Sequence, residues 1–158
     1  MIILGIDPGT TRIGFGFIDF SAGRFRHLKS GLLKIGVDPQ KRLLVLEKDL
    51  TQLISEFKPE LVGLEKLFFV KNQKTAFEVA ETRGVIKNTV LKNKIRIIEL
   101  SPSELKLGIT GDGRAPKNAI SKMVGYFLNL STHDFIDDVT DALALAIVVC
   151  GKNRFLSR

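Results

Sequence analysis

Apolar residues along this chain change their spacing, and the changes predict a sheet followed by helices. Residues 2–6, IILGI, are continuously apolar, as in a strand that is covered on both faces. Residues 12–20 then alternate, so the bulky side chains of IGFGF point to one face and its two glycines to the other. This alternation predicts a strand against a core, with a close neighbour on its glycine face.

A third strand is expected through RFRHLKSGLLKI, residues 24–35, with a bulge at Gly31. The connections between these first three segments are short. We therefore expect an antiparallel meander.

From residue 43 the apolar spacing becomes helical. Pro59 ends this first helix, and LVGLE, residues 61–65, predicts a fourth strand. A second helix is expected from about Asn72 to Leu91, and RIIEL, residues 96–100, predicts a fifth strand. The apolar positions that carry the two helices are Leu43, Leu46, Leu50, Leu53 and Phe57 in the first, and Phe77, Ala80, Gly84 and Val90 in the second.

The last third of the chain predicts further helices. SPSE has the form of a capping box, with Ser101 as N-cap and Glu104 three residues on. Residues 108–114 are expected to form a loop, after which Pro116 opens another helix. The inward residues are Ile120, Val124 and Phe127 in that helix, and Val139, Leu143, Ile147 and Cys150 in the last one.

This order of elements predicts an α/β fold. We expect a five-stranded mixed sheet, antiparallel over its first three strands and parallel afterwards, with helices on both faces. One domain should cover residues 1–151, because 158 residues suffice for one well-filled core. Residues 152–158 are basic and are expected to be a frayed tail.

Composition narrows the function classes. The net charge is +7 and the sequence pI about 9.7, which favours polyanionic partners. One cysteine, Cys150, allows no internal disulfide, and two histidines are too few for a Cys/His zinc site. No apolar run approaches the roughly 20 residues that span a bilayer, and the N-terminus has no signal-peptide pattern. We therefore expect a cytoplasmic protein with no membrane partner.

Four acidic residues are the main candidates for chemistry. Asp7 ends the first strand, Glu65 ends the fourth, and Asp138 and Asp141 share one face of the last helix because they are three residues apart. Parallel neighbouring strands would bring the first two together. A carboxylate cluster is costly to bury unless cations accompany it. The pattern predicts a site for two Mg²⁺ ions that clamp a phosphodiester.

Each acid also has a structural alternative. Asp7 begins Asp-Pro-Gly, which is common in turns, and Glu65 alone is typical of a solvated strand end. Asp138 and Asp141 would also suit the first turns of a helix, where the dipole favours acids, and Asp134 is a natural N-cap. The hypothesis of a metal site rests on the occurrence of all four acids together.

Basic and aromatic residues near these acids suit a nucleic acid. Lys117 opens a helix, where free N–H groups also attract phosphate. Lys92 and Lys94 are better explained as parts of solvated faces. Phe68 and Phe69 follow Glu65; such a pair is usually core, but an exposed one would stack on or wedge between bases. The candidate DNA-binding residues are Phe68, Phe69, Lys71, Arg83, Lys106, Arg114 and Lys117.

Three blocks in this order resemble the RuvC family of bacterial Holliday-junction resolvases, within the ribonuclease H-like nuclease superfamily. The blocks are GIDPGTTRIGFG with Asp7, EKLFFVKN followed by ETRGVI with Glu65, and DDVTDALALA with Asp138 and Asp141. The first block alone would be weak evidence. Together they extend over nearly the whole chain.

The resemblance implies a homodimer that binds a four-way DNA junction and nicks two opposed strands of like polarity, leaving 5′-phosphate and 3′-hydroxyl ends. It implies a requirement for Mg²⁺ or Mn²⁺ and cooperation with the RuvAB branch-migration helicase. It assigns the junction aromatic to Phe68, with Phe69 as the alternative. It places Lys106 and Lys117 near the scissile strand, and the helix around Arg83 and Gly84 in the dimer.

Three other functions compete with this one. GIDPGTTRIG also resembles the phosphate loop of actin-like ATPases, but the chain is too short for their two domains. A non-catalytic junction-binding module would lose an acid, and all four are present. Nucleases of the same fold that act on other nucleic acids are the closest rivals.

Overall fold

The computed structural model describes residues 1–66, 73–132 and 135–156. It contains the predicted five-stranded mixed sheet, in the order β3-β2-β1-β4-β5. β1 pairs antiparallel with β2 and β2 with β3, whereas β1–β4 and β4–β5 are parallel. The strands are β1 (Ile2–Asp7), β2 (Arg12–Ser21), β3 (Arg24–Lys34), β4 (Leu61–Glu65) and β5 (Arg96–Leu100).

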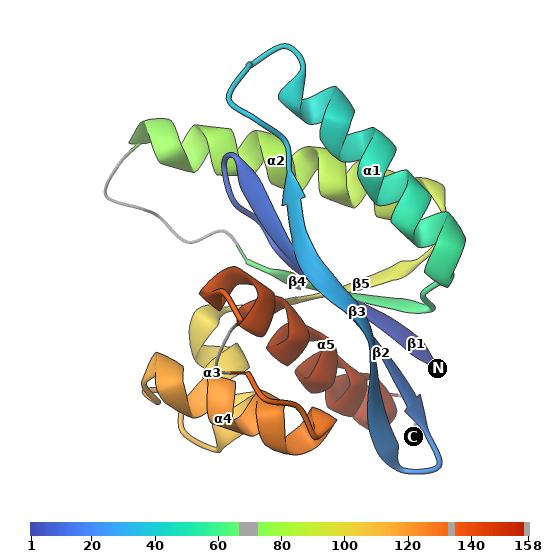
Figure 1. The fold of residues 1–158 in the computed structure, drawn as a ribbon, viewed down its shortest axis with the longest axis vertical. Helices are drawn as coiled ribbons and strands as arrows, with labels where there is room; N and C mark the ends of the chain where they lie inside the picture. The colour runs from blue at the N-terminus through green and yellow to red at the C-terminus, as the bar shows by residue number, and fades with distance from the viewer. Residues whose placement is uncertain (67–72, 133–134, 157–158) are drawn as a thin grey trace.

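Helices cover both faces of this sheet (Figure 1). On one face lie α1 (Arg42–Phe57) and α2 (Gln73–Lys92). On the other, α5 (Asp137–Leu156) crosses the sheet, and α3 (Pro102–Thr110) and α4 (Lys117–Leu128) pack outside it (Figure 1). Because α5 is enclosed between the sheet and these helices, nearly every residue from Val139 to Cys150 is buried.

Strand alternation divides the core into two clusters. Leu4 and Ile6 of β1 pack in the cluster of α1 and α2, whereas Ile3 packs in the cluster of α5. Side chains alternate along a strand, so Asp7 belongs to the α5 face with Ile3. By the same alternation in β4, Val62 and Leu64 face α1 and α2, and Glu65 shares the α5 face with Leu61.

Glycines of the central strands let α5 lie directly on the sheet. A Cβ atom on Gly5 would lie 1.8 Å from the backbone oxygen of Ala142, and one on Gly14 would lie 2.0 Å from that of Asp138. Gly16 meets the side chain of Leu143 in the same way. The close neighbour predicted for the glycine face is therefore α5, and its approach sets the depth of the acidic site.

The capping box of α3 is confirmed. The Ser101 side chain accepts from the backbone N–H of Glu104, and the Glu104 carboxylate accepts from the backbone N–H of Ser101. Gly108, however, lies inside α3 and was wrongly placed in the following loop. Its missing side chain serves packing, because a Cβ there would lie 2.4 Å from Cγ1 of Val148 on α5.

Three further expectations need correction. The ladder between β2 and β3 shifts its register at Leu28, not at Gly31, which pairs regularly with Phe15. Phe77 of α2 is 72% exposed and points away from the core, because Ile86 and Val90 occupy the face toward the sheet. Helix α5 continues through residues 152–156, where a frayed tail was expected.

Candidate active site

Asp7 and Glu65 lie side by side at the ends of parallel strands. β1 and β4 pair in register from Ile3 opposite Leu61 to Ile6 opposite Leu64, and each acid is the next residue of its strand. Both side chains point to the α5 face by alternation and are partly buried. The sheet therefore fixes two carboxylates at one edge of the α5 layer.

Helix α5 brings the other two acids to this edge. Asp7 pairs with Gly14 of β2, and the backbone of Asp138 lies directly over Gly14. Asp138 is in the first turn of α5 and Asp141 follows three residues later on the same face. The four predicted acids thus meet at one end of α5, although they come from three distant parts of the chain.

Electrostatics show how close the four groups are. Burial, together with the charges of Glu65, Asp141 and Asp138, raises the pKa of Asp7 to about 8. Burial followed by the charge of Asp141 raises the pKa of Glu65. Burial likewise raises the pKa of Asp141, with Asp137 and Asp138 adding to it. The site therefore resists accumulating negative charge unless cations enter it.

Two predicted lysines act on this site. Lys117, at the start of α4, lowers the pKa values of Asp7, Glu65 and Asp141 by its charge. Its own pKa is raised by a hydrogen bond to Asp137, 3.2 Å away, and by the charges of Asp137, Asp141 and Asp7. Lys106 of α3 also lowers the pKa of Asp141. Both lysines are near enough to the acids to offset the negative charge of a phosphate bound there.

Lys117 also lines a polar groove beside the acids. The groove has a volume of about 520 Å³. It continues from the first turn of α4 to the segment before α5, so it extends the basic surface away from the acidic centre. Its other lining residues are Asn118, Ser121, Lys122, Ser131, Thr132, Phe135 and Asp137.

Sequence reasoning missed one arginine at the site and one buried arginine on the opposite face of the sheet. Arg12, the first residue of β2, places its Nε 2.6 Å from Oδ2 of Asp138. Arg42 is buried and donates from Nη1 to the backbone oxygen of Thr10, 2.9 Å away, while it also pairs with Glu81 of α2. Arg12 was predictable, because it shares strand parity with Gly14 and so faces α5. Arg42 carried no such signal, since its partner is a loop carbonyl.

The donor set suits hard divalent cations, since it consists of carboxylate oxygens. Within the described ranges, no three acidic, histidine or cysteine side chains converge closely enough to hold a single ion as they stand. One of the four, Asp138, is engaged by Arg12. Divalent cations would offset the repulsion that raises the pKa of Asp7.

Arg83 does not lie where a phosphate contact was predicted. Its residue is 8% exposed, and Nη2 bonds to Glu99 of β5, which also accepts from Lys87 at 3.3 Å. Its charge lowers the pKa of Glu65, so this buried arginine favours the ionised form of that acid. Nη1 is buried without a hydrogen-bond partner in the part of the chain that the structure describes.

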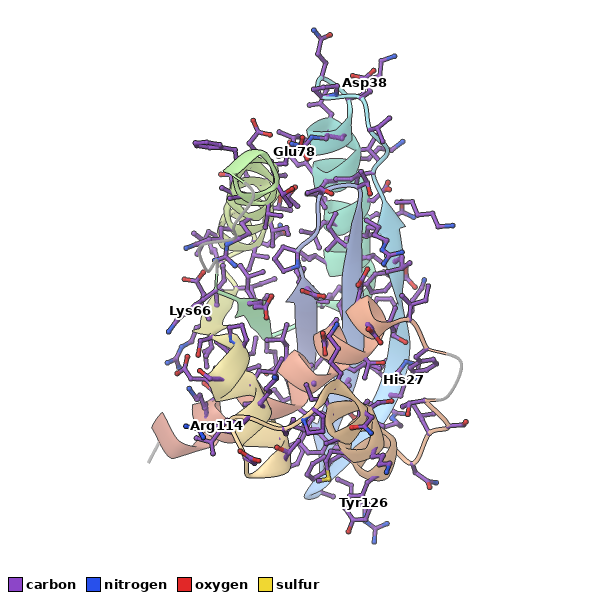
Figure 2. All side chains as sticks on the ribbon, turned by 90° about the vertical axis from the view of Figure 1, so that its left-hand side faces the viewer. His27, Asp38, Lys66, Glu78, Arg114 and Tyr126 are labelled. Carbon is purple, nitrogen blue, oxygen red and sulfur yellow. The ribbon has the colours of Figure 1, made fainter. Side chains whose placement is uncertain are left out.

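Arg114 is exposed and lines a second groove, of about 460 Å³, with Ser103, Leu107 and Asp112. In Figure 2 it lies on the same side of the molecule as Lys66, the residue after Glu65. The predictions for Phe68, Phe69 and Lys71, and for Asp134 as an N-cap, fall outside the described residues.

A mixed sheet of this order, with acids at the ends of β1 and β4 and on the helix that crosses them, is typical of ribonuclease H-like nucleases. The chain matches the family model described as crossover junction endodeoxyribonuclease RuvC over residues 3–149. Curated relatives with that description are similar to most of this chain. One from Caldicellulosiruptor saccharolyticus is 43% identical over 150 residues, covering 93% of this chain and 90% of the relative. One from Caldanaerobacter subterraneus subsp. tengcongensis is 37% identical, covering 100% and 97%.

Solved structures agree with this family. The structure of T. thermophilus RuvC in complex with a Holliday junction substrate superposes with a TM-score of 0.90 at 26% identity, covering 98% of this chain and 96% of that one. The yeast mitochondrial Holliday junction resolvase Ydc2, at 12% identity and a TM-score of 0.70, shares the fold. The chain belongs to the RuvC family.

Proposed function

We propose that this protein is a structure-selective endodeoxyribonuclease that resolves four-way DNA junctions by paired nicking. The observation that carries the proposal is the meeting of Asp7, Glu65, Asp138 and Asp141 at one end of α5, in a chain of the RuvC family. The products would be 5′-phosphate and 3′-hydroxyl ends, which a ligase can seal in recombination and repair.

Asp7, Glu65, Asp138 and Asp141 would hold two divalent cations, Mg²⁺ or in its place Mn²⁺. Such ions, when bound, supply charge stabilisation to the attacking and leaving oxygens of a phosphodiester. The protein contributes the placement: two acids are fixed by paired strands and two by a helix resting on glycines. Burial of these acids favours cation entry, because the cations relieve the cost seen in the raised pKa of Asp7.

The basic residues around the acids would bind the DNA backbone. Lys117 and Lys106 would contact phosphates next to the scissile bond, since both already interact electrostatically with Asp141. Arg114 and the groove beside Lys117 would bind phosphates farther along a junction arm. Phe68 or Phe69 would stack at the branch point, and Lys71 would contact the backbone nearby.

Paired nicking of opposed strands calls for two sites related by a two-fold axis. The outward face of α2 supports a homodimer, because it exposes Phe77 and Leu91, at 72% and 58%, in line with Ala80 and Gly84. An exposed apolar stripe on a helix is typical of an interface. We place the dimer contact there.

The setting of the reaction belongs to the same proposal. Among the described residues, no helix has the length and apolar character to cross a bilayer. We expect the protein to act in the cytoplasm, on junctions supplied by the RuvAB branch-migration helicase.

The decisive experiment compares four substrates with Mg²⁺: a four-way junction, a duplex, a single strand and an RNA–DNA hybrid. We expect symmetric nicks in the junction and little cleavage of the other three. Nicking should disappear with EDTA. Preferred cleavage of the hybrid or of plain duplex would contradict the proposal and favour another nuclease of the same fold.

A further inference from the structure

The ion pair between Arg12 and Asp138 gives Arg12 a specific relation to the acidic site. Arg12 Nε lies 2.6 Å from Oδ2 of Asp138, and the Asp138 side chain is 25% exposed. The backbone enforces this meeting, because Arg12 and Gly14 share the α5 face of β2 and Asp138 rests on Gly14. The positive charge of a guanidinium at this oxygen opposes the approach of a divalent cation to the same carboxylate.

The arginine itself is easily moved. Its side chain is 55% exposed. Among the described residues, its ion-pair partner is Asp138. An exposed ion pair contributes little free energy, so displacement of Arg12 costs the protein little. Arg42 is less easily displaced, since it is buried and donates hydrogen bonds to both Thr10 and Glu81.

We propose that Arg12 is a displaceable counter-ion that competes with divalent cations for Asp138 and thereby weakens metal binding by the acidic site. This inference rests on the proposed function, since it requires that the four acids bind cations. It gives a role to the ion pair that engages one of the four carboxylates. Arg12 acts through Asp138, so it is a positioning residue.

The first test measures Mn²⁺ binding without DNA, by electron paramagnetic resonance, for the wild type and Arg12→Gln. We expect the Kd to fall about two- to fivefold in the variant, which corresponds to roughly 0.4–1 kcal/mol at about 1.4 kcal/mol per tenfold change. The matched control is Arg26→Gln, which removes the same charge from an exposed arginine that pairs with Asp19 at 3.5 Å on the same sheet. That control should leave the Kd unchanged at physiological salt.

The outcomes separate this inference from the function it rests on. If the wild type bound no Mn²⁺, the metal site itself would be wrong. If the wild type bound Mn²⁺ and Arg12→Gln bound it equally or more weakly, only the role of Arg12 would be overturned. An equal tightening in Arg26→Gln would show a general charge effect and would also overturn it.

A second measurement is made on the unaltered protein, and a variant serves only to assign one resonance. The Nε–H resonance of Arg12, assigned by its loss in Arg12→Gln, is followed by NMR during titration with Mg²⁺. We expect it to move to the position of solvent-exposed arginines at saturation, while that of Arg26 stays in place. An Arg12 resonance that is unchanged at saturating Mg²⁺ overturns the competition.

Discussion

Two groups of carboxylates in this molecule have opposite electrostatic surroundings. Burial and like charges raise the pKa of Asp7 to about 8 and raise those of Glu65 and Asp141. The pKa of Glu104, at the start of α3, is lowered to about 2, first by the backbone N–H of Ser101 and then by Lys152. All four residues are carboxylic acids, but only around Glu104 do the neighbouring charges favour the ionised form.

The difference separates a structural acid from a candidate catalytic group. Glu104 caps a helix and accepts from Lys152 at 2.9 Å and Lys66 at 3.3 Å, so its charge stabilises the fold. Asp7 destabilises the fold when ionised, because the folded protein offers it a desolvated place beside other acids. Such an arrangement is retained where a ligand uses the charge.

The comparison is tested most strongly by Asp7→Asn. A metal ion contributes several kcal/mol of charge stabilisation, and about 1.36 kcal/mol is a tenfold change in rate, so we expect junction nicking to fall on the order of 10³-fold. Junction binding should persist, because the basic residues are unchanged. Nicking and gel-shift assays measure the two effects, and full nicking activity in this variant would remove Asp7 from the chemistry.

A second variant changes the packing of α5 against the sheet and leaves every charge in place. In Gly5→Ala the new Cβ would lie 1.8 Å from the backbone oxygen of Ala142, so the helix must move. We expect a loss of about 3 kcal/mol in the free energy of unfolding, measured in urea, and a loss of nicking as Asp138 and Asp141 shift. Gly151→Ala, also on α5 but with no atom within 4 Å, is the control and should be neutral or slightly stabilising.

The raised pKa of Asp7 makes stability depend on pH. Between about pH 4 and pH 8 the unfolded chain has lost the Asp7 proton, whereas the folded protein still holds it. The folded state therefore binds more protons, and the free energy of unfolding falls as pH rises through this range. In EDTA at pH 8, Asp7→Asn should be more stable than the wild type by on the order of 5 kcal/mol.

Thermal unfolding across this pH range measures the effect. Saturating Mg²⁺ should raise the Tm of the wild type more than that of the variant, because the cation binds the folded wild type. If the difference in Tm between the wild type and Asp7→Asn stayed constant from pH 5 to pH 8, the burial of Asp7 would be contradicted.

The smallest expected effect concerns the stabilised acid. Glu104→Gln keeps an acceptor for the Ser101 N–H and removes the charge shared with Lys152 and Lys66, so we expect a loss of about 0.5–1 kcal/mol at pH 7. The contribution of the charge is complete above the ordinary pKa of 4.5 and is lost as pH falls toward about 2. Glu47→Gln, which removes an exposed pair with Lys92, should change stability less.

The periodicity of the chain was enough to predict the order of strands and helices and the parallel pairing of β1 with β4. It failed for Phe77, because a helix that rests on the core by one face can also expose apolar residues, and the sequence does not say which stripe is inside. It failed for the bulge, since the extra residue is Leu28, which carries no conformational signal.

For the site, strand ends and helical spacing brought the four acids together, since parity along β1 and β4 decides which face a side chain takes. Arg83 was misjudged because a buried arginine and an exposed one look alike in sequence, and its partner Glu99 lies on a separate element, β5. Pairings such as Arg12 with Asp138 depend on how closely α5 approaches β2, which only the packing of whole layers determines.

The outer strand β3 has a consequence beyond the active site. It pairs with β2 on one side only, so its other side presents backbone groups that another chain could extend. Arg24, Arg26, Lys29 and Lys34 project from it as exposed residues. Lysine and arginine side chains along an edge strand disfavour edge-to-edge pairing of one molecule with the next.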